Sequence, residues 1–106
     1  MSLDIYFNNY YERVHSQNIT HNLASMANAA GFYKALWRPE ENGILLASQL
    51  AEALKPGIKK IKDNPDEFKS LSASNGWGTY EQFIPWLEEL LEACNEYPNA
   101  EISVSR

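Results

Sequence analysis

The sequence has few of the residues that most directly reveal a function. Its one cysteine, Cys94, excludes an intramolecular disulfide and a site built from several cysteines. No apolar run approaches the roughly 20 residues that a membrane span needs. The N-terminus has no basic segment followed by an apolar core, which is the pattern of a secretory signal. We therefore expect a cytoplasmic protein that has no membrane partner.

Basic residues are also few. Nine Lys and Arg stand against fourteen Asp and Glu, and the net charge is −5. This balance argues against direct binding to a nucleic-acid backbone. The two histidines, His15 and His21, do not have the spacing of zinc ligands, and there is no EF-hand pattern. We expect no metal and no cofactor.

The 106 residues have an ordinary globular composition, 44% apolar, which predicts a single domain covering residues 1–106. Side chains alternate between apolar and polar in residues 3–7 and again in 101–105, as in half-buried strands. Asn8 and Asn9 lie where a two-residue hairpin turn is expected, because Asn tolerates positive φ. Residues 10–19 are then the returning strand.

Apolar residues recur at three- and four-residue steps in the middle of the chain, which predicts helices. One helix is expected from Thr20 to residue 37, weakened at Gly31. The others are expected at 46–61, 65–71 and 80–97, and Pro56 should kink or break the first of these. The prediction is an α+β fold. An N-terminal hairpin and a C-terminal strand form a small antiparallel or mixed sheet against three to four helices.

Thr20, His21 and Asn22 bring a hydroxyl, an imidazole and an amide to the start of the first expected helix. Free backbone N–H groups at such a position favour an anion, so these residues could bind a carboxylate or phosphate. The simpler interpretation, which we favour, is that Thr20 caps the helix while the other two are hydrated.

The sequence Asn75-Gly76-Trp77-Gly78 belongs to the clearest loop in the chain. Two glycines let the backbone bend sharply on either side of one large ring. We favour a ring that folds inward over the core, and the alternative is a ring that stands at a binding surface. A ligand site made of this loop and residues 20–22 requires the two segments to be neighbours in space.

The last expected helix has an acidic face made of Glu88, Glu89, Glu92 and Glu96. A solvated helix face is the usual explanation. The functional alternative is an acidic ridge that meets a basic partner, for example a protein that itself binds nucleic acid. The lysines within residues 55–62 could also pair with this face in a second copy, giving a homodimer.

Cys94 could act as a nucleophile only beside a base and in an exposed position. It lies on the apolar face of its helix, so a small buried side chain is the better interpretation. No other catalytic arrangement is visible, and we expect a protein that is not an enzyme.

Several short segments together resemble a group of small proteins encoded by bacteriophages and some bacteria. These segments are residues 18–23 (NITHNL), 26–27, 30–31, 36–40 (LWRPE), 75–81 (NGWGTYE), 91–94 and 104–106 (VSR). The resemblance covers nearly the whole chain, and NGWGTYE is its most specific part. It implies a phage or mobile-element setting in a bacterial host and transfers no catalytic or binding residue.

The leading hypothesis is therefore a non-enzymatic module that binds another protein, in phage–host or mobile-element biology. Its predicted contact surfaces are the loop around Trp77 and the acidic face. One alternative is a small-molecule-binding protein or small enzyme that uses residues 20–22 and 75–78. Another is a structural protein that works as a homo-oligomer.

Overall fold

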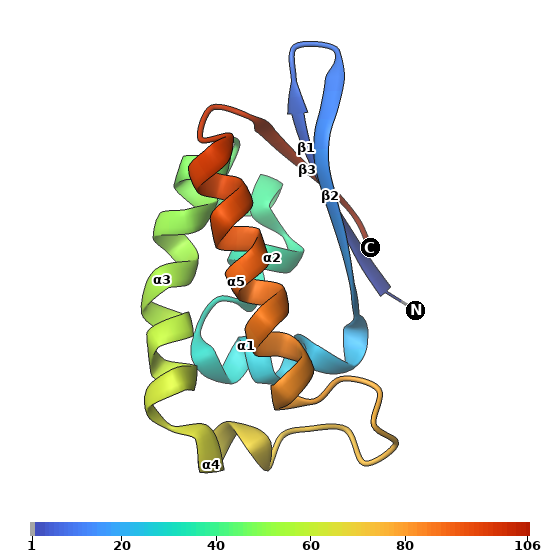
Figure 1. The fold of residues 1–106 in the computed structure, drawn as a ribbon, viewed down its shortest axis with the longest axis vertical. Coiled ribbons are helices and arrows are strands. Elements are labelled where there is room, and N and C mark those ends of the chain that lie inside the picture. The colour runs from blue at the N-terminus through green and yellow to red at the C-terminus, as the bar shows by residue number, and fades with distance from the viewer. Residues whose placement is uncertain (1) are drawn as a thin grey trace.

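The computed structural model describes residues 2–106 and has an α+β fold (Figure 1). Three strands, β1 (Ser2–Asn9), β2 (Glu12–Thr20) and β3 (Glu101–Ser105), form an antiparallel sheet in the order β2-β1-β3. The two ends of the chain thus share one sheet, as the alternating patterns predict. Pairing with the last strand satisfies the second edge of β1.

The hairpin turn lies two residues later than predicted. Asn8 and Asn9 belong to β1, and the turn is made by Tyr10 and Tyr11. Pairing runs from Phe7 opposite His15 to Asn8 opposite Arg13, with a bulge between them. The pairing from Ser2 to Phe7 is already centred on Tyr11, beyond the asparagines, and the extra residue in β2 brings the turn to Tyr10 and Tyr11.

The part of the chain between β2 and β3 forms the helices. They are η1 (His21–Leu23), α1 (Ala24–Ala30), α2 (Tyr33–Trp37), η2 (Pro39–Asn42), α3 (Ala47–Asp63), α4 (Pro65–Lys69) and α5 (Tyr80–Glu96). Residues 2–106 thus contain five α-helices, not three or four. The first expected helix is divided because Gly31 adopts φ 93°, a left-handed conformation that ends α1.

Helix α3 runs through Pro56 without the expected break. Pro56 is exposed, so the carbonyl that loses its intrahelical partner can be hydrated. The next residue, Gly57, is buried against the segment between α1 and α2. A Cβ at Gly57 would overlap the Phe32 ring and the Ala30 carbonyl oxygen, so glycine permits this close approach.

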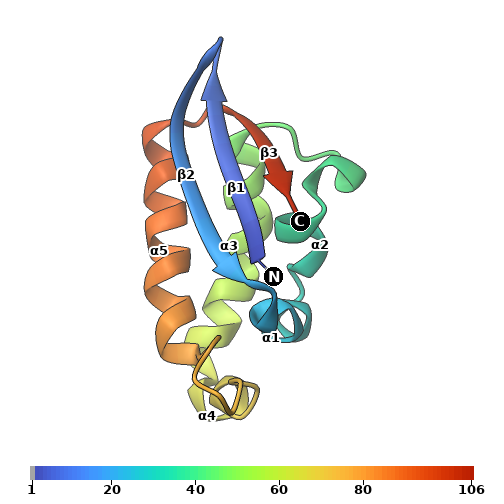
Figure 2. The ribbon, with the colours of Figure 1, turned by 90° about the vertical axis from the view of Figure 1, so that its right-hand side faces the viewer.

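The helices cover one face of the sheet (Figure 2). Leu3, Ile5 and Phe7 of β1 point into this layer and are fully buried. Helix α5 is tied to the edge strand, because Trp86 Nε1 donates to the Asn18 carbonyl (2.9 Å) and Gln17 Nε2 donates to the Trp86 carbonyl (3.0 Å). Among residues 2–106, no helix has both the length and the apolar character required to span a bilayer.

Candidate binding site at the Trp77 loop

The two segments predicted to form a ligand site are neighbours in the structure. Asn22 Nδ2 donates to the Trp77 carbonyl oxygen over 2.7 Å. Gly78 has φ 108°, and a Cβ there would lie 2.9 Å from Asn22 Cβ and 3.2 Å from Thr20 Cγ2. The loop can pack this closely on residues 20–22 only because position 78 is glycine.

The first turn of α5 holds the loop in shape. The Gln82 side chain accepts from Gly78 N (2.9 Å) and donates to the Gly76 carbonyl (3.1 Å). It also completes the capping box with Thr79, as the sequence spacing predicts. Asn75 Oδ1 accepts from Trp77 N (2.9 Å). The loop is therefore a braced structure with few free backbone groups.

The Trp77 ring points outward, so the prediction of an inward ring was wrong. It is 71% exposed, although indoles are usually among the more buried side chains. The backbone N–H and carbonyl of Trp77 are both bonded, to Asn75 and to Asn22. These bonds hold the residue at the surface, and the ring is presented to solvent from a fixed position.

Beside the ring lies a hollow of about 570 Å³, which we call the Trp77 hollow. It is lined by Ser2, Asn18, Thr20, His21, Asn22 and Trp77. Asn18 Nδ2 donates to Ser2 Oγ (2.9 Å) and to Asp4 Oδ1 (2.7 Å), which orients its amide. The lining contains hydroxyls, amides and an imidazole, and no carboxylate or lysine. It therefore suits a ligand that is recognised mainly through hydrogen bonds.

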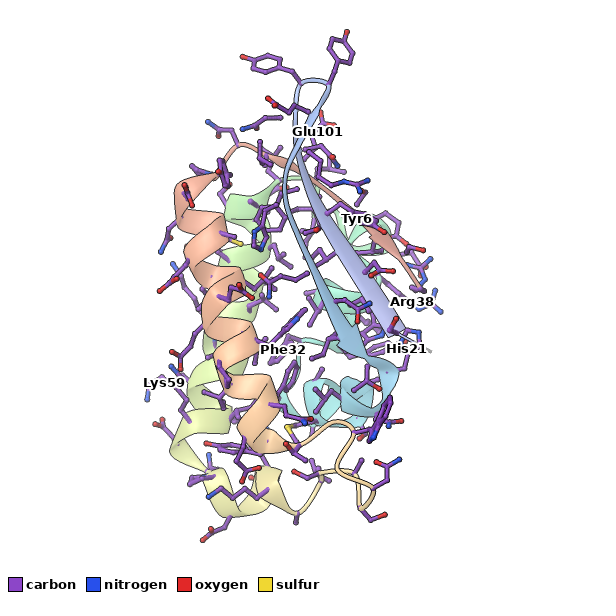
Figure 3. The ribbon with its side chains drawn as sticks, turned by 45° about the vertical axis from the view of Figure 1, so that its right-hand side comes forward. Tyr6, His21, Phe32, Arg38, Lys59 and Glu101 are labelled. Atoms are coloured by element: carbon purple, nitrogen blue, oxygen red, sulfur yellow. The ribbon has the colours of Figure 1, made fainter. Side chains whose placement is uncertain are left out.

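His21 has a partner that the sequence did not indicate. The buried Trp37 donates from Nε1 to His21 Nδ1 over 2.8 Å. Because an indole N–H can only donate, Nδ1 must accept, and the neutral imidazole carries its proton on Nε2. His21 thus satisfies a buried donor and lies at one end of the sheet (Figure 3). The separation of sixteen positions between His21 and Trp37 explains why no local pattern revealed the pair.

Thr20 does cap the segment that follows it, as expected. Its Oγ1 accepts from Asn22 N at 3.3 Å. The element it caps is the short η1, which has three residues. The geometry therefore supports the capping role of Thr20, while Asn22 serves the loop and His21 serves Trp37.

On its other side, His21 borders a second hollow of about 290 Å³ that contains Arg38 and Arg106. Both arginines are paired with glutamates. Arg38 bonds Glu41 at 2.8 Å, and the pKa of Arg38 is raised mainly by this hydrogen bond. Arg106 bonds Glu40, which lowers the pKa of that carboxyl. These ion pairs leave the second hollow poorly suited to an anion.

The acidic face of α5 is exposed along its length, at Glu88, Glu89, Glu92 and Glu96. Glu88 also lies 3.4 Å from Lys62 of α3. The neighbouring lysines have partners within the chain: Lys55 with Glu52, Lys59 with Asp63, and Lys60 with the Ala29 carbonyl. The arrangement is that of a solvated face, and its meeting with a basic partner or a second copy stays a prediction.

Cys94 has the buried position that its place on the helix predicts. It is 1% exposed, and burial raises the pKa of its thiol to about 11. A thiol of this pKa is almost entirely protonated at neutral pH and is a weak nucleophile. Within residues 2–106, no group of three or more His, Cys, Asp or Glu side chains is placed to hold a metal ion.

The structure also reveals two exposed aromatic residues in a segment that was predicted to begin the returning strand. Tyr10 and Tyr11 at the hairpin turn are fully exposed. The pair of adjacent tyrosines after Asn8-Asn9 was the available signal, because both cannot point to the same face of a strand.

No family model matches this chain, and no curated protein or solved structure is significantly similar to it.

Proposed function

We propose that this protein is a non-enzymatic binding module that recognises another protein through the Trp77 hollow. The observation that carries the proposal is a tryptophan that is 71% exposed yet held by backbone bonds on both sides. Exposed, pre-oriented indoles commonly supply much of the affinity at protein interfaces. Rigid presentation also lowers the entropy lost on binding.

The shape of the hollow favours a polypeptide ligand. Asn18 and Asn22 are exposed, and Ser2, Thr20 and His21 are half-buried, so the floor is shallow. Pockets for small molecules enclose roughly 70–90% of the ligand surface. A shallow surface with one aromatic anchor and several amides suits a chain segment, whose peptide groups offer donors and acceptors along its length.

A small polar molecule is the second candidate. It is favoured by the convergence of His21, Asn22 and Trp77 on one hollow of about 570 Å³, which lies within the usual size range of ligand pockets. In that case His21 Nε2 would donate to the ligand, because Nδ1 is occupied by Trp37. The chemistry of the lining predicts a neutral, hydroxyl- or amide-rich molecule.

Selection of a random displayed-peptide library on the immobilised protein tests the proposal without knowledge of the natural partner. We expect selected peptides to bind the wild type and the control Glu92→Gln alike, and Trp77→Ala at least about tenfold more weakly. Peptides that bind Trp77→Ala as well as the wild type would contradict the proposal. A small-molecule screen in which hits raise the Tm of the wild type but not of Trp77→Ala would favour the second candidate.

A further inference from the structure

The hairpin turn is made of residues that the turn itself does not favour. Tyr10 adopts φ 55°, a left-handed conformation that Gly and Asn adopt far more readily than an aromatic residue. Its ring and that of Tyr11 are fully exposed, so they contribute nothing to the core. Residues that oppose local structure without a packing gain commonly mark functional positions.

Next to Tyr10 lies a hollow of about 400 Å³, which we call the tip hollow. It is lined by Asn8, Asn9, Tyr10, Asn99 and Glu101. Figure 3 shows Glu101 near the hairpin end of the molecule, far from His21. Glu101 is exposed and is the only charged residue in the lining. Among residues 2–106 it forms no ion pair.

The same hairpin already holds a cation over an aromatic ring. The Arg13 guanidinium carbon lies 3.9 Å from the centre of the Tyr6 ring. Attraction between a cation and a tyrosine face strengthens as water is excluded. Tyr10 also lines the tip hollow, together with one carboxylate residue and three asparagines, and its ring is free to meet an incoming cation.

We propose that the tip hollow binds the cationic side chain of an arginine or lysine of a partner protein. The Tyr10 ring attracts the cation, the Glu101 carboxylate pairs with it, and the asparagine carbonyl oxygens accept its remaining N–H groups. The adjacent charges of Glu12 and Arg13 offset each other, so Glu101 supplies the local negative charge, and the net charge of −5 attracts basic partners over longer range. The same charges repel phosphate and anionic lipid headgroups. This surface is separate from the Trp77 hollow and does not depend on it.

The test is a titration of the labelled full-length protein, followed by NMR, with an acetylated hexa-arginine peptide. A hexacitrulline peptide, which has a similar shape but no charge, is the control probe. We expect amide shifts at Tyr10, Asn99 and Glu101 with the arginine peptide only. Glu101→Gln should weaken binding about tenfold. Glu67→Gln removes one exposed carboxylate from α4, outside the acidic face of α5, and should leave binding unchanged.

Tyr10→Asn provides a variant that keeps the fold, because Asn suits the positive φ of this position. We expect it to weaken arginine-peptide binding while its Tm is equal to or above that of the wild type. Equal binding by Glu101→Gln and Glu67→Gln would overturn the proposal, because attraction would then be due to net charge alone. The proposal would also be overturned if the hexacitrulline peptide bound as strongly as the hexa-arginine peptide. Self-association of the wild type that is lost in Glu101→Gln would overturn it as well.

Discussion

The hairpin turn and the loop that precedes α5 lie toward opposite ends of the long axis (Figure 1), and each exposes aromatic residues in a different way. At one end, Trp77 is held by contacts with residues 55 positions away in the sequence. At the other end, Tyr10 and Tyr11 extend from a turn between two residues that pair only with each other, Asn9 and Glu12. If the two proposed surfaces bind partners, substitutions should change binding and folding together at the Trp77 end and separately at the hairpin tip. Substitutions that distinguish these two cases test the comparison.

The largest effect is expected at Gly78. Gly78→Ala would place a Cβ 2.9 Å from Asn22 Cβ in a backbone with φ 108°. Strain and overlap together should cost about 3 kcal/mol of unfolding free energy, measured by urea denaturation. Gly76→Ala is the control, because its Cβ would meet nothing within 4 Å. It should cost only about 1 kcal/mol. Equal losses for the two variants would show that close packing does not hold the loop.

The bond between His21 and Trp37 should contribute the next largest effect. His21→Ala leaves the buried Trp37 N–H without an acceptor, which should cost about 1–3 kcal/mol in the same urea assay. His21→Asn offers an oxygen near the position of Nδ1 and should recover part of this loss. If His21→Ala were as stable as the wild type, His21 would be free of a structural role.

The hairpin tip should respond in the opposite direction. Tyr10→Asn relieves the left-handed strain at φ 55° and should increase the unfolding free energy by about 1 kcal/mol. Tyr11→Asn is the control, because Tyr11 does not have positive φ, and it should leave stability nearly unchanged. A loss of stability in Tyr10→Asn would mean that the Tyr10 ring supports the fold and would remove the contrast between the ends.

The smallest effect is expected at the pair of Glu40 and Arg106. Because the folded-state pKa of Glu40 is lowered, its contribution is present above the unfolded-state value and is lost as the pH falls through the folded-state value. The pair is largely exposed, so Glu40→Gln should cost only about 0.5 kcal/mol at neutral pH. The difference from wild type should shrink as the pH falls below the ordinary pKa of about 4.3 and vanish below the lowered folded-state pKa, which thermal unfolding across pH would detect. A difference that persists at low pH would assign the effect to packing.

Local patterns were sufficient for most of the fold. Alternation at Leu3, Ile5 and Phe7 predicted β1, and the same pattern predicted β3 and its pairing with the N-terminal hairpin. The predicted position of the turn was wrong because it depends on the register of β1 against β2, which no local pattern shows. Gly31 divided a predicted helix because it adopts a left-handed conformation and caps the end of α1, a common role of glycine that the prediction treated only as a weakening of the helix.

The candidate site was predicted in part. The sequence suggested that residues 20–22 and the Trp77 loop could act together, but only the structure shows that Gly78 packs on Asn22. The predicted orientation of the Trp77 ring was wrong because the orientation depends on hydrogen bonds to Asn22 and Asn75 that a loop sequence does not specify. The resemblance to phage-encoded proteins stays a prediction.

The most direct measurement follows the three indole N–H signals of the labelled protein by NMR while a selected peptide is added. Trp37 and Trp86 donate to His21 and to the Asn18 carbonyl, so their signals report internal contacts. The account predicts that the Trp77 indole and the Asn22 amide shift first and most strongly. Shifts confined to the glutamate face of α5, with the Trp77 signal unmoved, would contradict it.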